Sequence, residues 1–220
     1  MVFPLIELLF FFLVLPALFA FNLIPSALLV LFLLAFMLCL GMLFFDKTFD
    51  KKQLWNHAAL RPHLKRILIT YGISCLPVLL GLVLYDRKLL FILVRERPLL
   101  WALLMILYPL CSVYPQELVY RAFFFHRYKR FFPSRLMMIG ASAMAFSYMH
   151  IVFQNVVAVI FTLAGGILFA RTYNDTRSTC AASFEHALYG CFLFTAGLHS
   201  WFFRPAISIV ATIDAIFAMR

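Results

Sequence analysis

Ionisable side chains are rare in the apolar segments of this chain, and each costs at least about 2.5 kcal/mol to insert into hydrocarbon. Each of them therefore needs a structural or functional reason. The set comprises Glu7, Glu117, Arg121, His150, Glu185, His186, His199 and Asp214. Glu7, His199 and Asp214 lie apart from the others. We expect Glu7 and His199 near a membrane interface and Asp214 beside a pairing partner.

The other members of the set fall in three short segments. Glu117 and Arg121 are four residues apart, so they share a helix face and can form an ion pair. His150 ends the second segment. Glu185 and His186 are adjacent in the third, among small residues that allow close helix packing. Taken singly, the first segment could be a structural ion pair and each histidine a satisfied core residue, but three such segments in one small chain favour chemistry.

One glutamate and two histidines can activate water. A carboxylate can take a proton from water while one imidazole orients that water and the other donates to the developing oxyanion. Glu117, His150 and His186 are the candidates for these roles. Glutamate with two histidines is also a ligand set of catalytic zinc. The HExxH spacing is absent, so these three residues would have to bind zinc from three helices. We expect no cofactor, with zinc as the alternative.

The composition indicates that these groups lie in a protein surrounded by lipid. Of the 220 residues, 65% are hydrophobic and 13% are charged, far from the values of a soluble domain. The sequence predicts an all-α, polytopic transmembrane helix bundle of about eight helices, forming a single membrane domain over residues 1–220. The expected spans are 3–21, 27–45, 67–85, 99–115, 136–153, 156–170, 180–197 and 206–219. The fourth is expected to continue past Pro115 toward Phe132 as a kinked helix.

The net charge of +10 comes from basic loops, so we expect no nucleic-acid partner. Lysines and arginines gather in residues 46–66, 127–135 and 171–179. With eight spans these loops share one side, and the positive-inside rule predicts that both termini are cytoplasmic. The basic loop 86–98 is an exception on the other side. Residues 46–66 are also expected to form a helix on the membrane surface.

The three segments resemble the CPBP family of intramembrane proteases, which includes CAAX-processing endopeptidases and bacterial abortive-infection-type relatives. That family carries an EExxxR motif, then FxxxH, then HxxxN. In this chain the motifs read Gln116-Glu117-x-x-x-Arg121, Phe146-x-x-x-His150 and His186-x-x-x-Gly190. The resemblance covers about residues 100–195, and the order and the spacing between motifs match.

The resemblance implies an eight-helix bundle with a cavity open toward the cytoplasm, in a bacterial cytoplasmic (inner) membrane. It also implies cleavage of a membrane-associated or lipidated peptide or protein by a water that glutamate and histidine activate without metal. The catalytic residues would be Glu117, His150 and His186, supported by Gln116, Arg121, Phe146, Glu185 and Gly190.

Two positions depart from the family pattern. Gln116 stands in place of the first glutamate, and an amide is not a useful base near neutral pH. Gly190 stands in place of the asparagine and offers no side-chain donor. Glu117 could act as the base, although neighbours on a helix point about 100° apart. Glu185 is a second carboxylate near His186. Otherwise the chain is a pseudoprotease, Gln116 replaces the glutamate of an active parent, or the register is shifted by one residue.

Three function classes follow from these residues. The first is an intramembrane endopeptidase, and the second is a catalytically inactive scaffold that binds a partner's membrane segment. The third is a proton-coupled transporter using the same buried groups, which is disfavoured by the short chain and the lack of an inverted repeat. The sequence specifies neither the substrate nor the oligomeric state.

Overall fold

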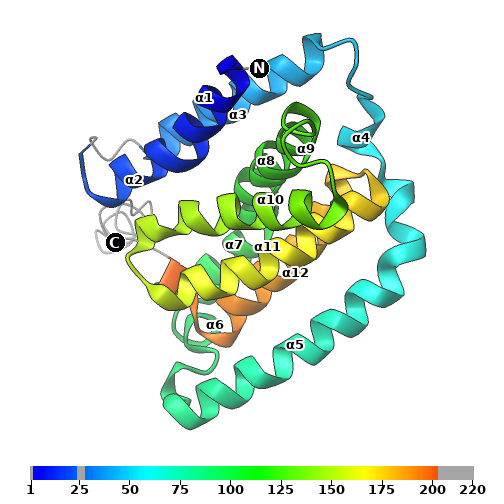
Figure 1. Ribbon diagram of the computed structural model, residues 1–220. Coiled ribbons are helices and arrows are strands. Elements are labelled where there is room, and N and C mark those ends of the chain that lie inside the picture. Colours follow the sequence, from blue (N-terminus) through cyan, green and yellow to red (C-terminus); the bar gives the residue numbers. More distant parts are fainter. Residues whose placement is uncertain (1, 24–27, 203–220) are drawn as a thin grey trace.

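The computed structural model describes residues 2–23 and 28–202, and these residues form the predicted helix bundle (Figure 1). No strand occurs among them. Seven of the eight predicted apolar segments fall in this part of the chain, and each is mainly helical. The eighth, 206–219, lies outside the described residues together with Asp214.

The first half of the chain forms two apolar helical segments, a polar connection and one long helix. The polar connection 46–66 was expected to be a surface helix, and it contains two short helices, α4 and η2; its position on the membrane stays a prediction. The elements are α1 (Val2–Leu9), η1 (Phe10–Val14), α2 (Leu15–Ala20), α3 (Leu28–Phe45), α4 (Lys52–Trp55), η2 (His57–His63), α5 (Leu64–Tyr85), η3 (Arg87–Leu89) and α6 (Ile92–Glu96).

The second half contains every element that carries the three motifs. Residues 98–127 form one continuous helix, so the predicted continuation past Pro115 is confirmed, and it ends at Arg127. Two π turns, η4 and η5, interrupt its α-helical pattern. The elements are α7 (Pro98–Tyr108), η4 (Pro109–Val113), α8 (Tyr114–Glu117), η5 (Leu118–Phe123), α9 (Phe124–Arg127), α10 (Arg135–Met149), η6 (His150–Phe153), α11 (Val156–Thr176), α12 (Thr179–Ala196) and η7 (His199–Phe202).

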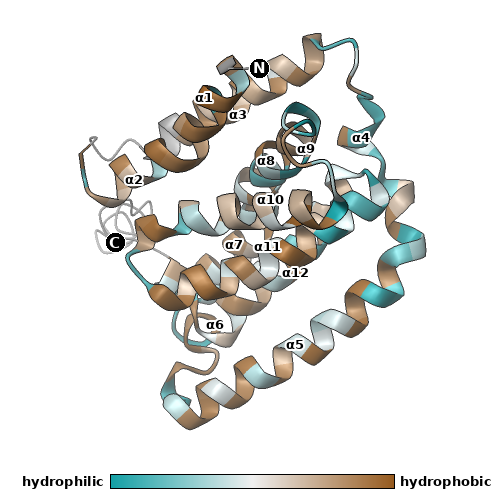
Figure 2. Cartoon of the chain, viewed as in Figure 1, coloured by the Kyte–Doolittle hydropathy of each residue, from teal (hydrophilic) through white to brown (hydrophobic). Residues whose placement is uncertain are grey.

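Several helices are long and apolar enough to cross a bilayer. The described residues contain five of them: Phe3–Ala20, His57–Tyr85, Pro98–Arg127, Arg135–Phe153 and Val156–Thr176. Phe32–Phe45 is a shorter apolar helix. The helix α12 is outside this group and contains both Glu185 and His186. Apolar colour dominates the long helices in Figure 2, whereas polar colour gathers at their ends and on α4.

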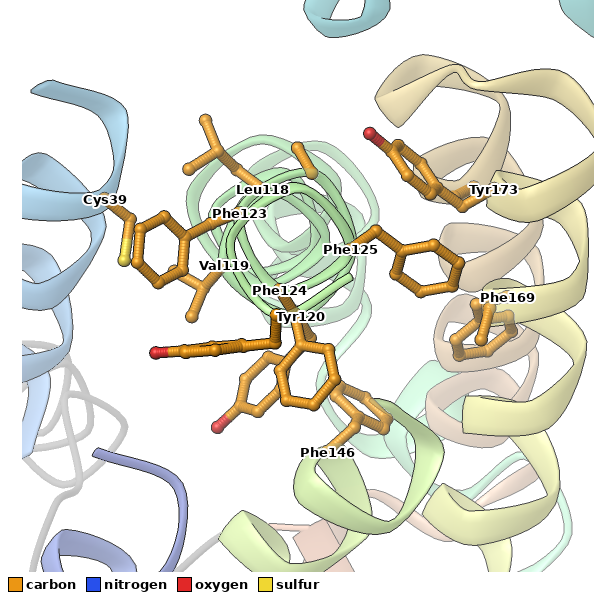
Figure 3. Close-up of a cluster of buried hydrophobic side chains, with 14 of the residues drawn as sticks. Cys39, Leu118, Val119, Tyr120, Phe123, Phe124, Phe125, Phe146, Phe169 and Tyr173 are labelled. Atoms are coloured by element: carbon orange, nitrogen blue, oxygen red, sulfur yellow. The ribbon is translucent and has the colours of Figure 1, made fainter. Parts of the chain in front are cut away.

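The second half of helix 98–127 forms the centre of the bundle. Every residue from 117 to 125 is buried, whereas a helix at a surface buries one stripe. Figure 3 looks along this helix and shows its side chains pointing outward on all sides. Phe125 meets Tyr173 of α11 with ring centroids 5.1 Å apart, and Tyr120 meets Phe146 of α10 at 5.4 Å. The elements that carry the motifs therefore pack around one another.

The three basic loops lie together at one end of the bundle, as predicted. Arg135 donates to Asp175 at 2.6 Å, and Ser178 donates to the carbonyl of Asn56 at 2.6 Å. Arg66 reaches Thr172 near the same end. The segment 86–98 lies at the opposite end of α12, where the Phe91 amide donates to the Ala196 carbonyl. The side of the membrane on which each end lies stays a prediction.

The expectation that Glu7 is isolated is wrong. Its carboxylate accepts two hydrogen bonds from Arg127, at 3.0 and 2.7 Å, and a third from the Tyr128 hydroxyl at 2.9 Å. The partners are 120 and 121 residues away along the chain, so no local spacing could reveal them. This pair joins α1 to the end of the central helix.

Candidate active site

Glu117 lies at the junction between α8 and the π turn η5, with its side chain fully buried. Its Oε1 lies 2.9 Å from Nδ1 of His186 on α12. Its Oε2 lies 3.2 Å from Nε of Arg121, one turn further along the same helix. The predicted pairing of Glu117 with Arg121 is confirmed, and the carboxylate also reaches a histidine of another motif.

Arg121 is fully buried, and several groups surround its guanidinium. One terminal nitrogen donates to the Ser142 hydroxyl at 2.8 Å, and the guanidinium carbon lies 5.0 Å from the centroid of the Phe146 ring. The Nε and Oε2 atoms of the ion pair are close, but they are not aligned as a hydrogen bond. The attraction between the two charges is therefore mainly Coulombic, and Oε2 keeps lone pairs for a better donor.

His186 is buried between two aromatic rings. Phe169 of α11 stacks on the imidazole with centroids 4.5 Å apart, and the Phe146 ring lies perpendicular to the imidazole with centroids 5.3 Å apart. Since a carboxylate accepts hydrogen bonds, we assign the proton of neutral His186 to Nδ1, which faces Glu117. Nε2 then has a lone pair, and it lies 3.2 Å from the Tyr108 hydroxyl.

His150 follows the last residue of α10 and is half-buried. Its Nδ1 lies 2.7 Å from the Phe146 carbonyl, so Nδ1 is the donor and Nε2 has the lone pair. The His150 ring lies 4.7 Å from the Phe146 ring, and His186 lies 5.3 Å from the same ring, so the two imidazoles are at most about 10 Å apart. Phe146, which Figure 3 labels, is thus the shared neighbour of Arg121 and both histidines.

Two further predicted residues, Gln116 and Glu185, have hydrogen-bond partners outside the Glu117–His186 pair. The Gln116 amide donates to Ser112 of its own helix at 2.7 Å. Glu185 is fully buried and accepts a hydrogen bond from Thr172 of α11, which also accepts one from Arg66. Glu185 is therefore part of a separate polar group, distinct from the Glu117–His186 pair.

Sequence reasoning missed four side chains of this region: Tyr108, Ser142, Phe169 and Thr172. Serine, threonine and aromatic residues are common in apolar helices, and none of these four stands at a motif spacing. Tyr108 is nine residues before Glu117, a separation that no short motif covers. Only the packing of α12 against the long helix reveals it.

The zinc alternative stays a prediction. Among residues 2–23 and 28–202 no group of three metal-ligating side chains is arranged around a metal position. A zinc ion bound by Glu117, His150 and His186 would have to compete with Arg121 for the carboxylate. Metal analysis of the purified protein tests this alternative directly.

The segment that contains these residues matches a known protein family. The family model described as "Type II CAAX prenyl endopeptidase Rce1-like" matches residues 98–192, somewhat less than half of the chain. This segment is Rce1-like. The resemblance predicted from the three motifs is thereby confirmed, and the matched segment contains Glu117, His150 and His186. With five long apolar helices among the described residues, the protein is a multi-pass integral membrane protein in which residues 98–192 are similar to CAAX endopeptidases. No curated protein and no solved structure gives a significant match.

Proposed function

We propose that this protein is an intramembrane endopeptidase that hydrolyses a peptide bond in a membrane-associated, prenylated or otherwise lipidated substrate. The observation that carries the proposal is the 2.9 Å contact between the buried Glu117 carboxylate and Nδ1 of His186. A carboxylate that orients an imidazole is the basis of general-base catalysis in many hydrolases. The match of residues 98–192 to the Rce1-like endopeptidases supports the reaction class.

The contacts favour His186 as the group that takes the proton from water. Both carboxylate oxygens of Glu117 face charged or imidazole groups, whereas the Nε2 lone pair of His186 faces the neutral Tyr108 hydroxyl, a weaker partner that water can replace. Glu117 would hold the imidazole in this tautomer and stabilise the imidazolium that forms. The base role first assigned to Glu117 thus becomes an orienting role in this proposal, while Glu117 stays essential.

The bond changes follow from this assignment. The water oxygen attacks the peptide carbonyl carbon as Nε2 of His186 accepts a water proton. The tetrahedral intermediate then collapses, the carbon–nitrogen bond breaks, and His186 returns the proton to the leaving amine. In this proposal the Nε2 lone pair of His150, whose Nδ1 donates to the Phe146 carbonyl, accepts a hydrogen bond from the attacking water.

The proposal extends to the location and partners of the protein. We propose that the end bearing the three basic loops faces the cytoplasm, with both termini on that side, in a bacterial cytoplasmic membrane. Substrates would be proteins or peptides that a lipid group holds at that membrane.

A second candidate function, a pseudoprotease that binds membrane segments, is favoured by Gln116. This residue stands where the family motif has a glutamate, and its amide donates to Ser112 of the same helix. A pseudoprotease would retain a lipidated peptide without cutting it. The Gln116→Glu variant would not gain cleavage if the side chain at this position kept its orientation toward Ser112.

The experiment compares the purified protein with three variants in proteoliposomes that contain a prenylated CAAX-type reporter peptide. We expect wild-type cleavage and at least about 100-fold lower rates for His186→Gln and for His150→Gln, because each removes one imidazole. Glu185→Gln is the matched control. It changes a buried carboxylate next to His186 while keeping an acceptor for Thr172, and it should retain most of the activity. Peptide capture with no cleavage by the wild type would support the pseudoprotease instead.

A further inference from the structure

Gly190 lies in the interior of α12, four residues after His186 and therefore on the same helix face. Its backbone has an ordinary helical conformation, so no turn or left-handed φ requires glycine. A Cβ added at this position would overlap the hydroxyl, Cε1 and Cζ atoms of Tyr108. Glycine is destabilising inside a helix relative to alanine, and the gain here is space for the Tyr108 ring.

The Tyr108 ring fills this space and presents its hydroxyl to the site. The Tyr108 oxygen lies 3.2 Å from Nε2 of His186, and the ring meets Phe194, two turns beyond His186 on α12, at 4.8 Å. The contact with Phe194 and the space left at Gly190 together determine the position of the Tyr108 ring. The hydroxyl therefore has a defined position at the ring nitrogen that faces away from Glu117.

The π turn η4 explains how one helix can reach both nitrogens of His186. Tyr108 and Glu117 are nine residues apart, and at about 100° per residue they would point to opposite sides of an unbroken α-helix. The five-residue π turn Pro109–Val113 lies between them and contains more residues per turn. It changes the angle between the two side chains, so that both contact α12.

We propose that Tyr108 is a further catalytic residue, whose hydroxyl supplies the oxyanion donor that the side chain at position 190 cannot provide. This proposal rests on the function proposed above. In the resting site the Tyr108 hydroxyl donates to Nε2 of His186. When substrate binds, this hydroxyl turns to the carbonyl oxygen of the scissile bond. The Nε2 lone pair is then free to accept the water proton, and the hydroxyl donates to the oxyanion that forms. Tyr108 keeps its own proton throughout, so the proton balance of hydrolysis is unchanged.

The first test is Tyr108→Phe, which removes only the hydroxyl. Loss of one oxyanion donor lowers kcat about 10²- to 10³-fold, and we expect a fall of that size with little change in KM. Tyr114→Phe is the matched control on the same helix, because the Tyr114 hydroxyl donates to the Leu54 carbonyl and not to the site. It should retain most of the activity, and thermal unfolding should show that both variants are folded.

The second test is a double-substitution cycle at the two positions. Gly190→Asn alone should abolish activity, because its side chain overlaps Tyr108. Tyr108→Ala alone should lose activity as well. The double variant Tyr108→Ala/Gly190→Asn should recover at least about tenfold over Tyr108→Ala, because the amide enters the vacated space and donates in place of the hydroxyl.

The outcomes separate this inference from the proposed function. If the wild type cleaves the reporter and Tyr108→Phe cleaves it within about twofold of the wild-type kcat, only the role of Tyr108 is overturned. If Tyr108→Phe is impaired but the double variant shows no recovery, Tyr108 positions His186 and is not a donor to substrate. If the wild type does not cleave at all, both proposals are overturned.

Discussion

The helix 98–127 takes part in two glutamate–arginine pairs that differ in almost every respect. Near its middle, Glu117 and Arg121 lie on the same helix and are fully buried. At its end, Arg127 binds Glu7 of α1, and the Arg127 side chain is 31% exposed. The first pair is not aligned as a hydrogen bond, whereas the second has two aligned hydrogen bonds.

This difference indicates different roles. The Glu7 carboxylate accepts three well-aligned hydrogen bonds from Arg127 and Tyr128, so it holds two helices together. The Glu117 carboxylate has one poorly aligned cation and one imidazole, so its charge is available to His186. An incompletely satisfied buried pair is costly to keep, which is typical of a functional site.

The largest expected effect is on the buried pair. Glu117→Asp keeps the negative charge for Arg121 but withdraws the carboxylate from His186 by one methylene. We expect cleavage to fall about 10³- to 10⁴-fold, the size of effect seen when a carboxylate no longer orients a catalytic histidine. The measurement is the kcat of reporter cleavage, with thermal unfolding in detergent as the control for folding. Activity near that of the wild type would remove Glu117 from the site.

Glu7→Gln should lower the stability of the protein and leave its catalytic rate almost unchanged. The substitution replaces a carboxylate with a neutral amide, so the hydrogen bonds from Arg127 lose their ionic partner. Hydrogen bonds to charged groups contribute about 1.5–3 kcal/mol each to stability. The contribution is smaller here because Arg127 is partly exposed to solvent. We expect the free energy of unfolding to fall by about 2 kcal/mol while kcat changes less than about threefold. Reversible unfolding in detergent measures the first, and the reporter assay the second. A large loss of kcat in a stable variant would mean that the two pairs are coupled.

The smallest effect is expected at Asp46, just after α3 and outside the long apolar helices. Hydrogen bonds from His126 and from Thr48 hold the pKa of the Asp46 carboxyl well below its usual range. A carboxyl with a lowered pKa contributes stability above its unfolded pKa of about 3.9, and this is lost as the pH falls through the lower folded pKa. Asp46→Asn should therefore lower the melting temperature slightly and evenly between pH 7 and about 5. The difference from the wild type should shrink below about pH 4, and an unchanged difference at lower pH would contradict this assignment.

The contrast between the pairs also shows what the sequence could predict. The Glu117–Arg121 pair was predictable because i,i+4 spacing is a local property of a helix. The helix segments were predictable from hydropathy, and the convergence of His186 on Glu117 was expected from the three polar segments and from the family resemblance. The Glu7–Arg127 pair and Tyr108 were not predictable, because each depends on which helices pack together and at what rotation. The two π turns, which set that rotation, leave no clear pattern in the sequence.

The complete burial of residues 117–125 has a consequence for biogenesis. The first half of helix 98–127 exposes large apolar side chains such as Leu99, Ile106 and Leu110, so it can enter the bilayer by itself. The second half contains Glu117 and Arg121, whose transfer into lipid is unfavourable in free energy. Its stable membrane position therefore depends on α10, α11 and α12, which follow it from the ribosome. Truncation after Arg127 should leave a chain that inserts inefficiently and is degraded, and addition of residues up to the end of α12 should restore insertion.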